Sequence, residues 1–336
     1  MRARRAESQA GVVLITVLLL VATMSALAVG FVEAMRLDIA RTQHGRAHVQ
    51  ARWYAFGAEQ YAEILLQRLW AAQGDAPQLQ RDWANPGLRL PIEGGLMVVR
   101  IAEGANCFNL NSVVRAGPDG FRLDPVGFAQ LRTLLEAIDL APGEARSLAA
   151  SVLDWIDSDG TPFPGGAEDA TYANGEPAYR TGNTLLADAS ELRVIQGFDL
   201  PLYRRLRPLV CALPTTDLSP FNLNTLRPDQ APLLSALTRG EISVERARGV
   251  IEDRPRGGYG SMQQFWRQDA FAGIALSERL RGQPALRSRY IRLITEVSLD
   301  DSTLAMDALL EQLGGGTIRV LRRSFGWPDT LRPDEI

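Results

Sequence analysis

Residues 11–32 read GVVLITVLLLVATMSALAVGFV, and this stretch decides the architecture. The 21 residues from Val12 to Val32 carry no formal charge, which is about the length that a helix needs to cross the hydrocarbon core of a bilayer. Arg2, Arg4 and Arg5 precede the run, and such basic flanks stay on the cytoplasmic side. The sequence therefore predicts one transmembrane helix, with the bulk of the chain beyond Val32 outside the cytoplasm.

A cleaved secretory signal is one alternative to this helix. Ala26-Leu27-Ala28 matches the small-x-small pattern of a signal peptidase site. However, the apolar run is longer than the usual core of a signal peptide, and the helical pattern continues beyond it without a proline. A plain retained anchor is the second alternative, and it shares every feature of the run itself.

Composition indicates an ordinary globular chain outside the membrane. With 336 residues, 46% of them hydrophobic, the chain can bury a sizeable core and form more than one module. Its net charge of -3 provides no overall positive field for nucleic acid. Cys107 and Cys211 are the two cysteines, an even number that suits a single bridge in an oxidising compartment.

The region from Glu33 to Gln73 contains no proline and has helical periodicity. Bulky apolar residues mark one face, namely Val49, Trp53, Phe56, Ile64 and Leu65, and small residues form a stripe, namely Ala51, Ala55, Ala58 and Ala62. We expect one long helix, half in the membrane and half as the spine of the outer part. His44 and His48 lie one turn apart and are interpreted as solvated helix residues, not metal ligands.

Four strand-like segments flank a long central region, and a loop over 74–87 precedes the first. They are 95–103, 289–298, 303–312 and 317–323, and Gly314-Gly315-Gly316 predicts a hairpin between the last two. If the first strand pairs with the others, the region between them is an insertion. The predicted fold class is α+β, a long N-terminal helix on an antiparallel sheet interrupted by a large α-helical domain. The expected divisions are 1–11, 12–32, 33–112, 113–284, 285–325 and a tail over 326–336.

The insertion has helical periods and an internal echo. Helices are expected around 128–138 and 148–156, and a third is expected to open at Ser190 as its N-cap. Residues 108–112 read FNLNS and residues 221–225 read FNLNT, each ending in a hydroxyl that can cap a helix. We infer two related helical units. The second, over 227–267, is similar to a helix-hairpin-helix module, so a membrane-tethered DNA-binding protein is an alternative function, although the surrounding region is acidic.

Carboxylates are concentrated between Asp154 and Glu191. Acidic groups held this close repel one another unless a cation bridges them, and hard oxygen ligands favour calcium. Counted from Asp157, the offsets of Asp159 and Glu168 match those of an EF-hand loop, but Pro162 stands where that loop requires glycine. The segment is therefore not an EF-hand, and a polar surface loop is the plainer interpretation.

Two resemblances bear on these patterns. The junction between Gly11 and the apolar run that begins at Val12 resembles a class III prepilin signal. This resemblance implies that a prepilin peptidase cleaves after Gly11 and that Val12 becomes the new, methylated N-terminus. The fifth mature residue, usually Glu in pilins, is Thr16 here, a departure shared by K-type minor pseudopilins. The acidic segment and the two FNLN motifs also resemble that family, the minor pseudopilin K of type II secretion systems.

The resemblance implies a specific biology. K-type subunits are expected at the tip of a periplasmic pseudopilus, anchored in the bacterial inner membrane, where they help to start assembly for protein export. The implied partners are the I and J minor pseudopilins and the major pseudopilin. A structural calcium is implied in the insertion, and the matching positions are Asp157, Asp159, Glu168 and Asp169, then Asn183 and Asp188. A periplasmic disulfide between Cys107 and Cys211 is expected.

No signature of an enzyme accompanies these features. The sequence lacks the serine-hydrolase elbow, the zinc-protease HExxH, the phosphate-binding Walker loop and the dinucleotide glycine pattern. A minor pilin of a type IV pilus would share the leader and the spine helix. Only the insertion distinguishes it from the secretion-system subunit.

Overall fold

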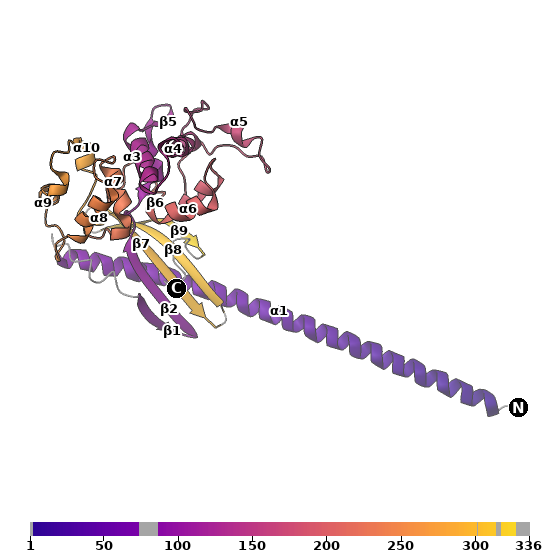
Figure 1. Ribbon diagram of the computed structural model, residues 1–336. Helices are drawn as coiled ribbons and strands as arrows, with labels where there is room; N and C mark the ends of the chain where they lie inside the picture. The colour runs from indigo at the N-terminus through magenta and orange to yellow at the C-terminus, as the bar shows by residue number, and fades with distance from the viewer. Residues whose placement is uncertain (1–2, 74–86, 301, 314–316, 327–336) are drawn as a thin grey trace.

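One helix, α1 (Ala3–Gln73), dominates the computed structural model, which describes residues 3–73, 87–300, 302–313 and 317–326. Its first half projects away from the rest of the chain, and its second half packs on a sheet (Figure 1). Within the described residues, only this helix is long and apolar enough to cross a membrane, with a mean hydropathy of 2.8 in its most apolar window. The arrangement fits a single-pass anchor that carries a folded outer part.

The outer half of α1 packs on the sheet through its small residues. Ala51, Ala55, Ala58 and Ala62 are each at most 1% exposed. Of the bulky residues, Trp53 is 70% exposed and Val49 and Ile64 are also exposed, whereas Phe56 is half-buried against the same core. Small side chains allow the helix axis to approach the strands closely, so the alanine stripe, not the bulky stripe, meets the sheet.

Five antiparallel strands form the main sheet, in the order β1-β2-β7-β8-β9. Their bounds are β1 (Leu88–Ile92), β2 (Gly95–Glu103), β7 (Tyr290–Leu299), β8 (Ser302–Gln312) and β9 (Ile318–Phe325). The pairing of β2 with β7 brings together segments far apart in sequence, as the insertion hypothesis requires. Sequence patterns missed β1, a short edge strand that contains Pro91, and the expected glycine hairpin at 314–316 lies outside the described residues.

Two helical hairpins form the centre of the insertion between β2 and β7. Helices α3 (Pro125–Ala137) and α4 (Pro142–Ile156) make the first, and α7 (Ala231–Leu237) and α8 (Val244–Glu252) make the second. They share one hydrophobic core. The smaller elements are β3 (Phe108–Asn109), η1 (Leu110–Val113), β4 (Val114–Gly117), β5 (Gly120–Leu123), α5 (Asp169–Tyr172), η2 (Ala189–Val194), α6 (Leu200–Leu206), η3 (Arg207–Leu209), β6 (Val210–Cys211), η4 (Pro228–Gln230), α9 (Met262–Trp266), η5 (Asp269–Phe271) and α10 (Glu278–Arg281). The expected fold class, α+β with a long helix on an antiparallel sheet and further helices, is confirmed.

The two FNLN motifs have matching roles in the two hairpin units. The amide of Asn111 accepts from Leu186 N and donates to Leu186 O, and the amide of Asn224 pairs in the same way with Tyr259 N and Tyr259 O. Each amide therefore ties the start of its unit to the chain that returns after the second helix. The expectation that the terminal hydroxyls cap helices is wrong, because Ser112 and Thr225 donate to the carbonyls of Asn109 and Asn222.

The insertion is fastened to the sheet at its base. Cys107 and Cys211 form a disulfide across the parallel pair β3 and β6. Beside it, the half-buried carboxylate of Glu103 accepts hydrogen bonds from Ser288, Thr225 and Asn222. Burial raises the pKa of Glu103, and these donors act in the opposite direction. One carboxylate thus joins the end of β2 to both the second unit and the return to β7.

Candidate metal centre

Three carboxylates meet where α4 ends. Asp157 is the C-cap of α4, and the following loop brings Asp159 and Glu168 back to it, so that one oxygen of each lies within 4.8 Å of the others. The backbone N–H of Asp157 still donates to Leu153 O, which fixes the carboxyl at the end of the helix. Three carboxylates at this separation supply the hard oxygen ligands that a divalent cation such as calcium prefers.

Two oxygens of this cluster are buried without a hydrogen-bond donor. Asp157 is 6% exposed and Glu168 is 5% exposed, and Asp157 Oδ1 and Glu168 Oε1 have no partner among the described residues. A buried carboxylate oxygen without a donor is costly unless a proton, a water or a metal ion satisfies it. Asp159 is exposed, so the cluster opens to solvent on one side.

Protonation is the alternative to a cation here. Burial, followed by the negative charges of Asp159, Asp154 and Glu168, raises the pKa of Asp157 to about 7. Burial also raises the pKa of Glu168, with the charge of Asp154 as the next cause. A bound divalent cation would reverse this repulsion and hold these groups ionised.

Asp154, which the sequence-based ligand set omits, lies one helical turn before Asp157 and is fully buried. Its carboxylate accepts from the backbone N–H of Phe163, which folds the loop over the end of α4. Burial raises the pKa of Asp154 to about 6, although this hydrogen bond acts to lower it. Gly166 passes so close that a Cβ there would lie 2.1 Å from Asp154 Oδ2. The spacing of Asp154 and Asp157 on the helix was the signal that could have identified it.

Two further predicted ligands, Asp169 and Asn183, lie outside the group of three carboxylates. Asp169 accepts from the hydroxyl and backbone N–H of Thr181, and these two hydrogen bonds lower the pKa of Asp169. Asn183 is exposed, with a positive φ of 44°, and its backbone N–H donates to Trp155 O. Both lie on the same loop as the cluster, but the structure groups neither with the three carboxylates.

Asp188 has a structural role away from the cluster. It is the N-cap of η2, accepts from Ser190 N, and pairs with Arg322 of β9. The expected N-cap, Ser190, is therefore wrong by two residues. Burial acts to raise the pKa of Asp188, but the Ser190 hydrogen bonds and the charge of Arg322 bring it below its usual value. This carboxylate ties the end of the acidic loop to the edge of the main sheet.

Three aromatic rings pack beside the carboxylates. Trp155 lies edge-on to Tyr172 at 5.3 Å and to Tyr179 at 6.2 Å between ring centroids. Tyr172 follows Asp169 in α5, and its hydroxyl accepts from Gln196 N. These rings supply the apolar packing for a loop that has few other buried side chains, and they place an indole close to the cluster.

In the second hairpin unit, Arg254 follows helix α8, and hydrogen bonds to the backbone hold its guanidinium in place. Arg254 donates to Leu223 O and Leu226 O, so its charge is turned toward its own backbone. Arg246 of α8 likewise donates to Asp269 O. In a helix-hairpin-helix protein such arginines would support a DNA phosphate. Here these two hold the fold of the unit, which disfavours the DNA-binding alternative.

The predicted processing and assembly positions lie in the first half of α1, which is continuous through Gly11 and Val12. Thr16 is exposed on the helix, and its hydroxyl donates to Val13 O at 2.8 Å. A threonine bonded to its own helix offers no negative charge to a neighbouring N-terminal ammonium. Thr23 repeats the arrangement one heptad later, with its hydroxyl on Leu20 O.

Known proteins resemble this chain along most of its length. Two family models described as type II secretion system protein K match residues 106–215 and 221–286. Type II secretion system protein K of Pectobacterium carotovorum is 34% identical over 97% of this chain and 99% of that protein, and its Klebsiella pneumoniae counterpart is 35% identical over 95% and 97%. A chain in the crystal structure of the GspK-GspI-GspJ complex from enterotoxigenic Escherichia coli superposes with a TM-score of 0.74 at 30% identity, covering 86% of this chain and 100% of that one. This chain therefore belongs to the type II secretion system protein K family and is a minor pseudopilin of that system.

Proposed function

We propose that this minor pseudopilin caps the tip of the pseudopilus and helps to start its assembly. The observation that carries the proposal is the uncharged Thr16, whose hydroxyl is already bonded to Val13 O. A subunit with another subunit above it must neutralise that neighbour's buried terminal charge, which is costly to leave unpaired in an apolar environment. A subunit with nothing above it has no such charge to neutralise.

The shape of the chain supports the same position. The inserted helical region lies at the end of α1 that is remote from the N-terminus (Figure 1). It is joined to the pilin-like sheet by the disulfide and by the Glu103 hydrogen bonds, so it is not a freely tethered domain. A broad head fastened there would obstruct the stacking of another subunit above this one.

The partners that we propose are the I and J minor pseudopilins, with the major pseudopilin below them. A solved structure that resembles this chain is that of a GspK-GspI-GspJ complex, which supports the first two partners. We further propose that a prepilin peptidase cuts after Gly11 and exposes Val12 for methylation. The mature chain would then be held by α1 in the bacterial inner membrane, with a non-enzymatic, structural role in the periplasm.

Calcium is the proposed ligand of the candidate metal centre. Asp157, Asp159 and Glu168 supply the hard oxygens, and the two unpartnered buried oxygens support a bound cation. Asp169 and Asn183 lie on the same loop, and a shift of that loop would be needed to bring them to the ion. The ion would have a structural role, holding a long acidic loop against the end of α4.

Electron microscopy of assembled fibres tests the tip position. The I, J, K and major pseudopilins of one system are assembled, and a gold-labelled tag on the K head is counted. We expect one label at one end of each fibre, because the head prevents further stacking. Labels repeated along the shaft would contradict the proposal, and N-terminal sequencing that does not start at Val12 would contradict the processing step.

A further inference from the structure

Asn174 differs from the other asparagines that the structure describes. Most of them are buried, and their amides donate hydrogen bonds within the insertion, namely Asn106, Asn109, Asn111, Asn222 and Asn224. Asn174 and Asn183 are exposed, and only Asn174 is followed by glycine, which makes it part of the one Asn-Gly pair in the sequence. Asn174 therefore combines an accessible amide with a neighbour that lacks a Cβ.

The chain around Asn174 is exposed and irregular. Every residue from Ala173 to Arg180 is exposed, and none belongs to a helix or a strand. The preceding helix, α5, has only four residues, too few to be stable by itself. Local opening of the backbone costs least in segments of this kind.

Two local hydrogen bonds hold Asn174 and Gly175 in place. Asn174 Nδ2 donates to Ala170 O at 3.0 Å, and Gly175 N donates to Tyr172 O at 3.2 Å. Both residues are exposed, so water can replace these bonds. The bonds therefore slow a rearrangement of the pair and do not prevent it.

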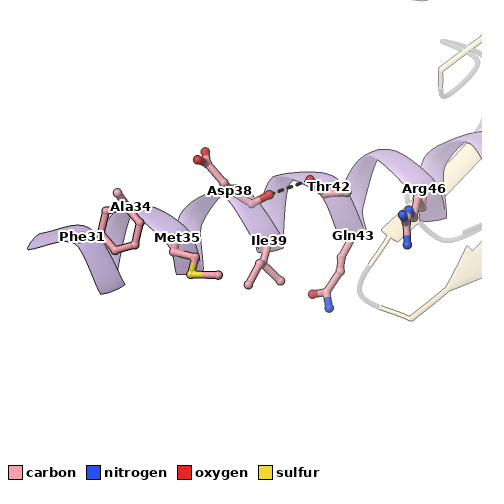
Figure 2. Close-up of a pocket in the computed structure, with 8 residues that line it drawn as sticks. All are labelled: Phe31, Ala34, Met35, Asp38, Ile39, Thr42, Gln43 and Arg46. Carbon is pink, nitrogen blue, oxygen red and sulfur yellow. Dashed lines mark hydrogen bonds between the residues drawn. The ribbon is translucent and has the colours of Figure 1, made fainter. Parts of the chain in front are cut away.

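The bond from Asn174 to Ala170 O joins residues four positions apart, as does the bond from the Thr42 hydroxyl to Asp38 O on α1 (Figure 2). Asp38 belongs to a helix of 71 residues, whereas Ala170 belongs to a single turn. The same kind of bond is therefore less well supported at Asn174 than on α1.

Neither packing nor the backbone requires glycine at position 175. A Cβ at Gly175 would lie 3.4 Å from Tyr172 O and 3.6 Å from Pro177 O, which are ordinary contacts, and Gly175 is not among the glycines with a positive φ. What the missing Cβ does provide is room for the backbone nitrogen of Gly175 to approach the side chain of Asn174. Alanine fits at this position and provides a matched control.

We propose that Asn174 is a site of spontaneous deamidation. Once the Gly175 N–H leaves Tyr172 O, the backbone nitrogen gives its proton to hydroxide and attacks Cγ of Asn174. The side-chain nitrogen takes up a proton and leaves as ammonia, and a cyclic succinimide joins the two residues. Water then adds to one of the two ring carbonyls and breaks the bond from that carbon to the ring nitrogen. The product is aspartate or its β-linked isomer, so one water is consumed and one ammonia is released.

The conversion adds a negative charge to a loop that is already acidic. Asn174 lies between Asp169 and Glu176, and the N-cap of α5 is Glu168, one of the three carboxylates of the candidate metal centre. A carboxylate at position 174 cannot donate to Ala170 O, so α5 also loses this side-chain bond. The insertion thus has a slow route to a more acidic loop, whether or not a cation occupies the centre.

Peptide mapping of the full chain tests the site. The purified protein is incubated with a calcium chelator in mildly alkaline and in mildly acidic buffer. Trypsin cuts after Arg146 and Arg180 and releases residues 147–180, in which Asn174 is the only asparagine. We expect mass spectrometry to show aspartate and isoaspartate at Asn174, formed faster in alkaline buffer because the attacking nitrogen must lose its proton.

Two controls separate the reaction from general damage. Asn183, which is exposed but is followed by Thr184, should remain unchanged. Gly175→Ala should slow the conversion of Asn174 by about tenfold or more, because a Cβ hinders the approach of the backbone nitrogen. Since residue 175 is exposed, this variant should keep the melting temperature of the unsubstituted chain. No isoaspartate at Asn174, an equal rate in Gly175→Ala, or equal conversion of Asn183 would each overturn the inference.

Discussion

With no cation at the candidate metal centre, the free energy of unfolding should fall as the pH rises from about 5 to about 7.5. Burial and neighbouring carboxylates raise the pKa of Asp157 from 3.8 to about 7 in the folded chain. The folded chain therefore keeps this proton at pH values where the unfolded chain has lost it, so stability is lost as the pH rises toward 7. For one group, the free energy of unfolding changes by at most about 1.4 kcal/mol per pH unit. Since partial hydration of the carboxyl weakens the effect, we expect a total loss of about 2 kcal/mol over this pH range.

Urea denaturation with and without a calcium chelator measures the effect. With a slope of about 2 kcal/mol per molar urea, the chelated protein should unfold at a urea concentration about 1 M lower at the higher pH. Calcium at about 100 times its dissociation constant should restore about 2.7 kcal/mol.

The matched variant is Asp157→Asn, which removes the charge and keeps the shape. It should stabilise the chelated protein at the higher pH, flatten its pH dependence and abolish the stabilisation by calcium. A variant that is less stable than the unsubstituted chain in chelator, or one still stabilised by calcium to the same extent, would refute the reasoning. The same titration with terbium, read through emission sensitised by the nearby Trp155, reports binding directly.

Three further variants test the folded region outside the membrane. Replacing Cys107 and Cys211 by Ser removes a disulfide that joins residues 104 positions apart, and it should lower the free energy of unfolding by about 4 kcal/mol in urea denaturation without reductant. Under reducing conditions the unsubstituted chain loses the same bridge, so the difference between the two proteins should vanish. Ala55→Leu should cost about 1–3 kcal/mol by overpacking the helix against the sheet, whereas an unchanged melting temperature would show that the contact is loose. Glu59→Gln should cost about 1–2 kcal/mol, because the buried Glu59 accepts two hydrogen bonds from Arg323, and a variant that is equally stable would contradict the importance of this pair.

Patterns with a local cause were predictable from the sequence. The charge-free run from Val12 to Val32 and the absence of proline to Gln73 predicted the single long helix, because helix formation depends on neighbouring residues. Strand β2 has the predicted bounds, and the other three predicted strands differ by one or two residues, because runs of strand-forming residues bounded by turn signals are visible in the sequence itself. Strand β1 was missed since it is short and contains Pro91.

The candidate site was only partly predictable. The sequence contains the acids, and three of them, Asp157, Asp159 and Glu168, do converge. Sequence alone could not assign Asp188 to a helix cap and to Arg322, because that partner lies 134 residues away on another part of the fold. The spacing of Asp154 from Asp157 could have identified Asp154 as a candidate, but only the fold shows that it is buried at the end of α4 and closely approached by Gly166.

The sequence by itself thus determined the anchor, the long helix and the inventory of carboxylates, since each depends on residue types and their spacing along one segment. The tertiary structure decided which face of α1 meets the sheet and which remains open. The alanine stripe and the stripe containing Trp53 both have helical spacing, and hydrophobicity favours burial of the bulkier one. The alanine face is buried because the sheet must approach the helix closely, a steric condition that exists only once β2, β7 and β8 have assembled.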